Sequence, residues 1–147
     1  MRTVRDILKV KGHDVWCVEA NSTVYEALVK MAEKNVGALV VLENGKLVGI
    51  FSERDYARKV ILKGRSSLNT PVKDIMTSEV YCVRPDQTLD ECMVLMTDKR
   101  IRHLPVLEND QLVGIVSIGD VVKEIIAEQG ITIQQLENYI IGGGYGQ

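Results

Sequence analysis

The order of apolar and polar positions is the same in the two halves of the chain. Residues 15–18 and 80–83 are brief runs rich in β-branched and aromatic side chains, which is typical of strands. Each run is followed by Thr-x-x-Glu, beginning at Thr23 and Thr88, a pattern that caps the start of a helix. Apolar residues then recur with helical spacing. We therefore expect a strand and then a helix in each half.

Two more strands and a second helix are expected after the first helix. Residues 38–42 form an apolar run, and residues 46–51 form its returning partner. Between them lies Asn44-Gly45, a strong signal for a hairpin turn. A second helix is expected from about residue 52 to residue 62. The complete order in each half is therefore β-α-β-β-α.

The two halves are an internal repeat. Residues 15–61 align with residues 80–126 at a constant offset of 65, and about twenty of the 47 aligned positions are identical. A short lead-in, residues 4–8, also resembles residues 72–76, with a spacing that slips by three. The sequence divides into repeat 1 (1–65), a linker (66–71), repeat 2 (72–130) and a helix turn with a flexible Gly-rich tail (131–147). A phosphate-binding loop in that tail is disfavoured, because no Lys-Ser/Thr follows its glycines.

Composition and charge narrow the class of protein. Hydrophobic residues make up 46% of the chain and charged residues 26%, as in soluble globular proteins. The net charge of -2 gives no basic field for nucleic acid, and no apolar run approaches the roughly 18 residues that span a bilayer. Three cysteines without a CxxC pair, and only two histidines, disfavour both a zinc site and a disulfide framework. We expect reduced thiols and a cytoplasmic location.

A short polar signature follows the last predicted strand of each repeat. It is Ser-x-x-Asp, from Ser52 to Asp55 and again from Ser117 to Asp120. A Ser followed three residues later by an acidic side chain caps a helix, so the signature has a purely structural interpretation. The same helix start offers unpaired N–H groups to a phosphate, and a carboxylate can accept both hydrogen bonds of a ribose diol. The residues alone leave both interpretations open.

The signature and its surroundings resemble tandem CBS domains, also called a Bateman module. The resemblance covers about residues 4–126 and is carried by the repeated element order, by Leu-Val-Gly-Ile before each Ser-x-x-Asp, and by Ile-Arg-His-Leu-Pro-Val at residues 101–106. Residues 53–58 and 64–67 are similar to small stand-alone bacterial and organellar members. The resemblance implies an α+β fold whose two repeats pack sheet to sheet about a pseudo-two-fold axis.

The resemblance also implies two clefts that take an adenine nucleotide such as AMP, ATP or NAD, without a metal. The two Asp side chains are expected on the ribose, the two Ser side chains near the phosphate, strand residues around the adenine and basic side chains at the phosphates. The expected nucleotide-binding residues are Val15, Trp16, Cys17, Ala38, Leu39, Ser52, Glu53, Arg54, Asp55, Arg58, Val80, Tyr81, Cys82, Arg102, His103, Leu104, Pro105, Ser117, Ile118, Gly119 and Asp120.

Positive charge is distributed differently around the two signatures. The first contains Arg54, where the second has Gly119, and Arg102 and His103 stand in the second repeat where the first has Gly-Ala. We expect the two sites to differ in affinity or in preferred ligand. Structural alternatives remain open: basic runs are usually solvated helix faces, a His beside Leu-Pro is often structural, and Trp16 and its equivalent Tyr81 either pack in a core or stack on adenine.

Three classes of function follow. The favoured one is a regulatory module that senses energy or redox state through adenine nucleotides and acts in signal transduction on an unidentified protein target. A structural homodimer without ligand is the alternative. An enzyme fragment related to IMP dehydrogenase is least favoured, because that activity needs a separate barrel of about 250 residues. We expect no catalysis, and a homodimer formed through the helices near residues 24–34 and 90–99.

Overall fold

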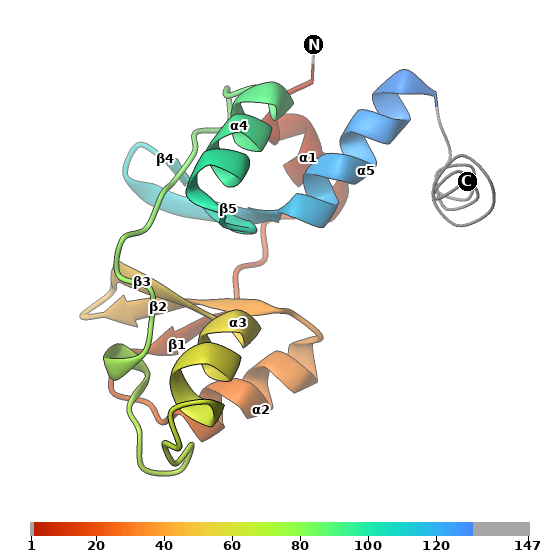
Figure 1. Ribbon diagram of the computed structural model, residues 1–147. Helices are drawn as coiled ribbons and strands as arrows, with labels where there is room; N and C mark the ends of the chain where they lie inside the picture. Colours follow the sequence, from red (N-terminus) through yellow and green to blue (C-terminus); the bar gives the residue numbers. More distant parts are fainter. Residues whose placement is uncertain (1, 131–147) are drawn as a thin grey trace, which may run out of the picture. The chain divides into compact units, whose positions relative to one another are not determined.

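The protein consists of two compact units, each built from segments of both halves of the sequence. The computed structural model describes residues 2–130. Unit A comprises residues 14–81, and unit B comprises residues 1–13 together with residue 82 onward. Figure 1 shows helices and strands in both, which confirms the predicted α+β class. The helix turn and Gly-rich tail predicted for residues 131–147 lie outside the described residues.

Unit A contains a three-stranded sheet in the order β1-β2-β3. Strand β1 runs parallel to β2, and β2 is antiparallel to β3 across the predicted turn. Its elements are β1 (Cys17–Glu19), α2 (Val24–Lys34), β2 (Ala38–Glu43), β3 (Lys46–Ser52), α3 (Glu53–Asp55), η1 (Tyr56–Ile61) and η2 (Val72–Asp74).

Unit B repeats this plan with a smaller sheet. Strands β4 and β5 form an antiparallel pair with the same register as β2 and β3. Its elements are α1 (Val4–Lys11), α4 (Leu89–Lys99), β4 (His103–Glu108), β5 (Gln111–Ser117) and α5 (Ile118–Gln129).

The prediction of a strand at residues 80–83 is wrong about its length. Only an isolated parallel bridge between Val83 and Val106 forms there. In unit A, the backbone N–H of Val40 donates to the carbonyl of Trp16 and extends the pairing of β1. The equivalent of Val40 is Pro105, which has no N–H to donate. One proline therefore removes the hydrogen bond that would have lengthened this strand.

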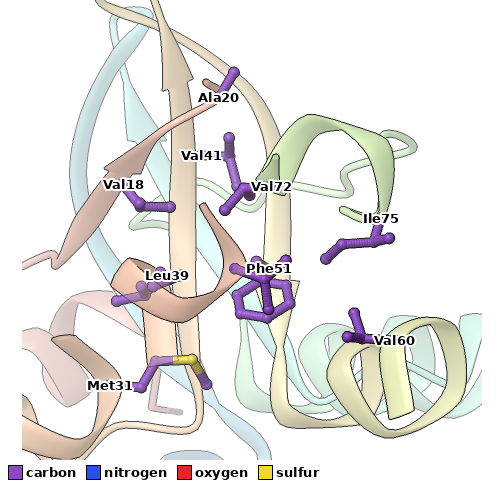
Figure 2. Close-up of a cluster of buried hydrophobic side chains, with 11 residues drawn as sticks. Val18, Ala20, Met31, Leu39, Val41, Phe51, Val60, Val72 and Ile75 are labelled. Carbon is purple, nitrogen blue, oxygen red and sulfur yellow. The ribbon is translucent and has the colours of Figure 1, made fainter. Parts of the chain in front are cut away.

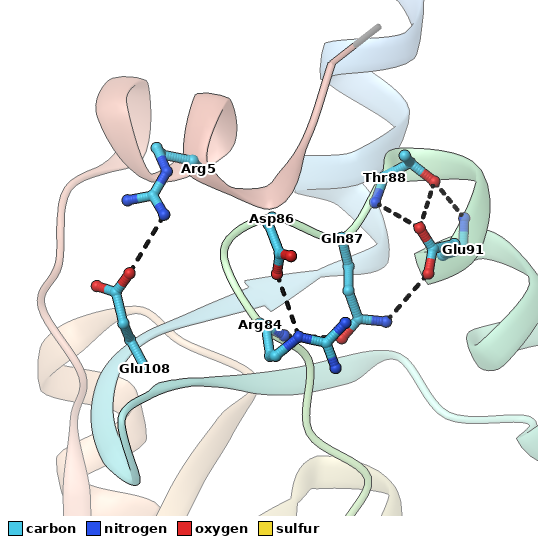
Figure 3. A network of polar contacts seen from close by, with 7 residues as sticks. All are labelled: Arg5, Arg84, Asp86, Gln87, Thr88, Glu91 and Glu108. Carbon is cyan, nitrogen blue, oxygen red and sulfur yellow. Dashed lines mark hydrogen bonds and ion pairs between the residues drawn. The ribbon is translucent and has the colours of Figure 1, made fainter.

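The helices begin where the capping signals predict. In α2 the N–H of Glu26 donates to Thr23 Oγ1 at 3.1 Å, and Glu26 Oε1 accepts from the N–H of Thr23 at 3.1 Å. Thr88 and Glu91 repeat this capping box at the start of α4, as Figure 3 shows. The helix predicted at residues 52–62 differs, because only three residues are α-helical and Tyr56–Ile61 is a π-helix.

A cluster of buried apolar side chains forms the core of unit A. Figure 2 shows Phe51 of β3 within this cluster, together with Leu39 of β2 and Val60 of η1. The members of the cluster are Val18, Ala20, Val24, Ala27, Met31, Leu39, Val41, Phe51, Val60, Val72 and Ile75. Val72 and Ile75 belong to the lead-in of the second repeat, so the core of unit A is completed from outside the first repeat.

Each lead-in packs against the other repeat and not against the repeat that it precedes in the sequence. The second lead-in places Met76 against Gly49 of β3, and the first lead-in, within α1, places Leu8 against Gly114 of β5. An ion pair of 3.2 Å between Arg5 and Glu108 of β4 also holds α1 on unit B (Figure 3). The compact units therefore differ from the division expected from the sequence, because each lead-in belongs to the unit of the repeat on which it packs.

We expect Gly114→Ala to lower the free energy of unfolding by about 1–3 kcal/mol, because the added methyl group overpacks the site. A Cβ at this position would lie 2.6 Å from Leu8 Cδ2. Urea unfolding measures the change. Gly119→Ala is the matched control, since a Cβ there would come no closer than 3.6 Å to Ser117 Oγ. Equal stability of Gly114→Ala and the unmodified chain would contradict the packing of Leu8 on this glycine.

Candidate functional site

The first Ser-x-x-Asp signature lies where β3 ends and α3 begins. Ser52 is the N-cap residue: its Oγ accepts from the N–H of Asp55 at 3.1 Å, and Asp55 Oδ2 accepts from the N–H of Ser52 at 3.0 Å. The Ser52 hydroxyl also lies 3.1 Å from Asp55 Oδ2. The structural interpretation of the signature is therefore correct as far as it goes, because the two residues cap the helix reciprocally.

Asp55 has further partners that capping does not require. Its Oδ1 accepts from Thr77 Oγ1 at 2.9 Å and pairs with Lys59 Nζ at 3.1 Å. The residue is only 7% exposed. A buried carboxylate is stable only when hydrogen bonds and opposite charge replace its hydration, and these contacts supply both.

The second signature has the same cap and a different set of partners. Ser117 Oγ accepts from the N–H of Asp120 at 3.1 Å, and Asp120 Oδ2 accepts from the N–H of Ser117 at 2.8 Å. Lys11, the last residue of α1, donates to Asp120 Oδ2 at 2.6 Å. Burial acts to raise the pKa of Asp120, but the hydrogen bonds from Lys11 and Ser117 outweigh it and the pKa is lowered.

The sheet register places the residues predicted for the second repeat beside its signature. His103 pairs with Ser117 across β4 and β5, as Ala38 pairs with Ser52 across β2 and β3. The N–H of Ile118 donates to the carbonyl of Arg102 at 2.9 Å. His103 is half-buried, and burial with the nearby charges of Lys11 and Arg102 lowers its pKa below the ordinary value. Its imidazole is therefore neutral at pH 7.

The predicted adenine-lining residues occupy several environments. Trp16 packs against the core of unit A, and Lys34 Nζ lies 4.3 Å from the centre of its ring. Leu39 and Leu104 are fully buried. Val80 and Tyr81 belong to unit A, whereas Cys82 belongs to unit B. Pro105 and Ala38 are buried, and Val15 and Cys17 are half-buried. The remaining predicted residues at the two helix starts are exposed: Glu53, Arg54, Arg58, Ile118 and Gly119.

The cysteines do not have the character of redox-active thiolates. Burial raises the pKa of the Cys92 thiol to about 11 and also raises the pKa of Cys17 and Cys82. Low-pKa thiolates are the reactive form, so these groups are protonated at neutral pH. Among residues 2–130, no cluster of three His, Cys, Asp or Glu side chains is arranged to hold a metal ion. Nor does any helix in that range have the length and apolar character needed to cross a membrane.

Three residues at the signatures escaped the sequence analysis: Lys11, Thr77 and Lys59. Lys59 belongs to the basic run of Arg58, Lys59, Lys63 and Arg65, and such runs are usually solvated helix faces, but its position four residues after Asp55 is a signal for an ion pair. Thr77 directly follows the second lead-in, and Lys11 lies three residues after the end of the first. The repeat shows that the lead-ins are related, but it does not show which signature each one reaches.

Comparisons with known proteins agree on one family. The family model of the CBS domain matches residues 4–62 and 72–127. The mitochondrial CBS domain-containing protein CBSX3 of Arabidopsis thaliana is 46% identical over 151 residues, which cover 96% of this chain and 73% of that protein. The structure of a CBS-domain protein of Burkholderia ambifaria, provisionally assigned to signal transduction, is 51% identical. Its TM-score is 0.84, over 89% of this chain and 98% of that one.

A further solved structure contains adenosine compounds. It is the CBS domain pair of protein MJ0100 in complex with 5′-methylthioadenosine and S-adenosyl-L-methionine. It is 25% identical to this chain, with a TM-score of 0.77, over 87% of this chain and 98% of that one. Each of the two segments matched by the family model in our chain contains one Ser-x-x-Asp signature.

We expect Lys11→Gln to raise the pKa of Asp120, because the glutamine removes the positive charge that favours the carboxylate. Since the folded-state pKa lies below the ordinary value of 3.8, the pair stabilises the fold above that pH, and this contribution is lost as pH falls through the folded-state pKa. Carboxyl NMR titration measures the shift. Lys9→Gln, which removes an exposed charge from the same helix, is the control. An unchanged pKa would contradict the Lys11–Asp120 pair.

Proposed function

The chain belongs to the CBS-domain family, and on that premise we propose that it is a regulatory module that binds an adenosine-containing ligand at each Ser-x-x-Asp signature. The ligand is an adenine nucleotide such as AMP, ATP or NAD. The module senses energy or redox state and acts in signal transduction on another protein, without catalysing a reaction itself. The complex of the MJ0100 domain pair with two adenosine compounds supports an adenosine ligand.

The single observation that carries the proposal is the carboxylate of Asp120 at the start of α5. Its hydrogen bonds from the N–H of Ser117 and from Lys11 both end on Oδ2. A carboxylate has about four acceptor positions, so Asp120 can accept two more hydrogen bonds. A ribose diol supplies two such donors. The side chain is 21% exposed, and the exposed Gly119 has no side chain to keep a phosphate from the helix N-terminus.

At the first signature, donors of the protein use the acceptor positions of the Asp55 carboxylate. Asp55 receives the N–H and hydroxyl of Ser52 on Oδ2, and Thr77 and Lys59 on Oδ1. These four contacts fill the acceptor positions of a carboxylate. A ribose at Asp55 must therefore displace Thr77 or Lys59, whereas a ribose at Asp120 need displace neither of its partners. We accordingly assign tighter binding to the second signature.

Calorimetric titration of the nucleotide-free chain tests this assignment with AMP, ATP, NAD and S-adenosylmethionine. We expect Asp120→Asn to weaken the tighter binding event about 10- to 100-fold, because a charge-assisted hydrogen bond becomes a neutral one. Asp55→Asn should weaken only the second, looser event. Asparagine keeps an acceptor oxygen for the cap, so both variants should remain folded.

Two results would overturn the proposal. The absence of heat and of a thermal shift with every ligand would leave Ser-x-x-Asp as a helix cap alone. Ligand binding that both variants leave unchanged would place the ligand elsewhere. Equal affinity at the two signatures would contradict only the ranking of the sites.

A structural homodimer is the second candidate, and exposed apolar side chains favour it. Val29 of α2 and Val94 of α4 are equivalent positions of the repeat, and they are 37% and 59% exposed. Tyr25 lies on the same helix as Val29 and is 51% exposed. We place the contacts of a homodimer on α2 and α4. Such a dimer is compatible with ligand binding, so the titration above decides between a sensor that dimerises and a dimer without ligand.

We expect Val29→Asp combined with Val94→Asp to convert a dimer into a monomer, because a charge introduced at an apolar contact must be desolvated. Sedimentation velocity measures the assembly. Val10→Asp, at a position 80% exposed on α1, is the control and should leave assembly unchanged. An unmodified chain that sediments as a monomer would contradict the dimer.

The remaining expectations from the sequence stay predictions. These are a cytoplasmic location and the absence of nucleic-acid or membrane partners. The Arabidopsis relative is mitochondrial.

A further inference from the structure

Lys11 lies at the second signature, although in the sequence it belongs to the first of the two segments that match the CBS family model. Its Nζ donates to Asp120 Oδ2 at 2.6 Å and to the carbonyl of Ile115 at 2.8 Å. An ammonium group has three donors, so one donor of Lys11 remains after these two bonds. The side chain is 34% exposed and can turn on its flexible stem.

The equivalent position after the other lead-in carries the opposite charge. Leu8 packs on Gly114 as Met76 packs on Gly49, which fixes the structural alignment of the two lead-ins. Three residues after Leu8 stands Lys11, and three residues after Met76 stands Glu79. Glu79 accepts from the hydroxyl of Tyr81 at 2.8 Å. The lead-in of unit B therefore brings an ammonium group to its signature, whereas the lead-in of unit A brings the Thr77 hydroxyl.

The charges around Asp120 add up in favour of an anion. The positive charge of Lys11 balances the carboxylate of Asp120, and Arg102 lies close enough to lower the pKa of His103. The acidic Glu124 of α5 is paired with Arg2. A neutral ligand still meets Asp120 through its ribose, whereas a phosphate gains in addition a charged donor from Lys11.

We infer that Lys11 is the residue that selects anionic ligands at the second signature, binding the phosphate of an adenosine compound whose ribose is held by Asp120. The inference rests on the function proposed above. Lys11 keeps its contact with the carboxylate and turns its remaining donor to the phosphate. The second site thus takes phosphorylated adenosine compounds in preference to uncharged ones.

The experiment compares a charged with an uncharged ligand at this site alone. In the full chain carrying Asp55→Asn, calorimetry measures the affinity for AMP and for 5′-methylthioadenosine, with and without Lys11→Gln. We expect Lys11→Gln to weaken AMP about tenfold or more, and to change the affinity for 5′-methylthioadenosine less than about twofold. Lys11→Arg should keep the preference for AMP, because arginine retains both the charge and the donors.

Controls separate this inference from the proposed function. Lys9→Gln removes the same net charge from the same helix and should leave both affinities unchanged. Equal weakening of both ligands by Lys11→Gln would mean that Lys11 only supports Asp120 and would overturn the inference. So would an unchanged affinity for AMP. If the unmodified chain binds neither ligand, the proposed function itself fails, whereas binding that is insensitive to Lys11 leaves that function intact.

Discussion

The packing of one lead-in side chain onto one glycine determines how each signature is completed. Leu8 lies on Gly114 and Met76 lies on Gly49, so close that a methyl group on either glycine would collide with the side chain above it. This contact fixes the position of the residues that follow. Thr77 comes directly after Met76 and reaches Asp55, and Lys11 comes three residues after Leu8 and reaches Asp120. A packing contact between apolar groups thereby decides which polar group meets each carboxylate.

The two signatures show how one motif supports two electrostatic environments. Both use the same reciprocal cap between serine and aspartate, with nearly the same distances. They differ in the groups that the rest of each unit adds. Asp55 gains the hydroxyl of Thr77 and an ion pair with Lys59, four residues along the chain, whereas Asp120 gains an ion pair with Lys11 of α1. The cap therefore supplies a common geometry, and the added partners set how readily each carboxylate can accept a ligand.

The structural and functional interpretations of Ser-x-x-Asp do not exclude each other. Capping uses part of the acceptor capacity of each aspartate, and it holds the carboxylate rigidly beside a helix N-terminus. That rigidity lowers the entropic cost of holding a ligand at the same carboxylate. The question for each site is how many acceptor positions remain after the protein has used its own donors, and the answer differs between Asp55 and Asp120.

The sequence by itself determined the repeat, the α+β class, the helix starts and the hairpins, because all of these depend on residues close together in the chain. Thr23 and Glu26 are three residues apart, and so are Ser52 and Asp55. The register that pairs His103 with Ser117 also follows from the hairpin. These local contacts were sufficient to predict the reciprocal cap of serine and aspartate at each signature.

The tertiary structure alone decided the distant partners of those aspartates, Thr77 and Lys11. Lys11 and Asp120 are 109 residues apart, and no local pattern links them. The shortened strand at residues 80–83 is a related case, since the proline that limits it lies in another strand. Each lead-in belongs to the unit whose glycine its apolar side chain contacts. These contacts depend on packing between segments that are distant in the sequence. A single sequence shows which residues are apolar, but it does not show which of them are in contact.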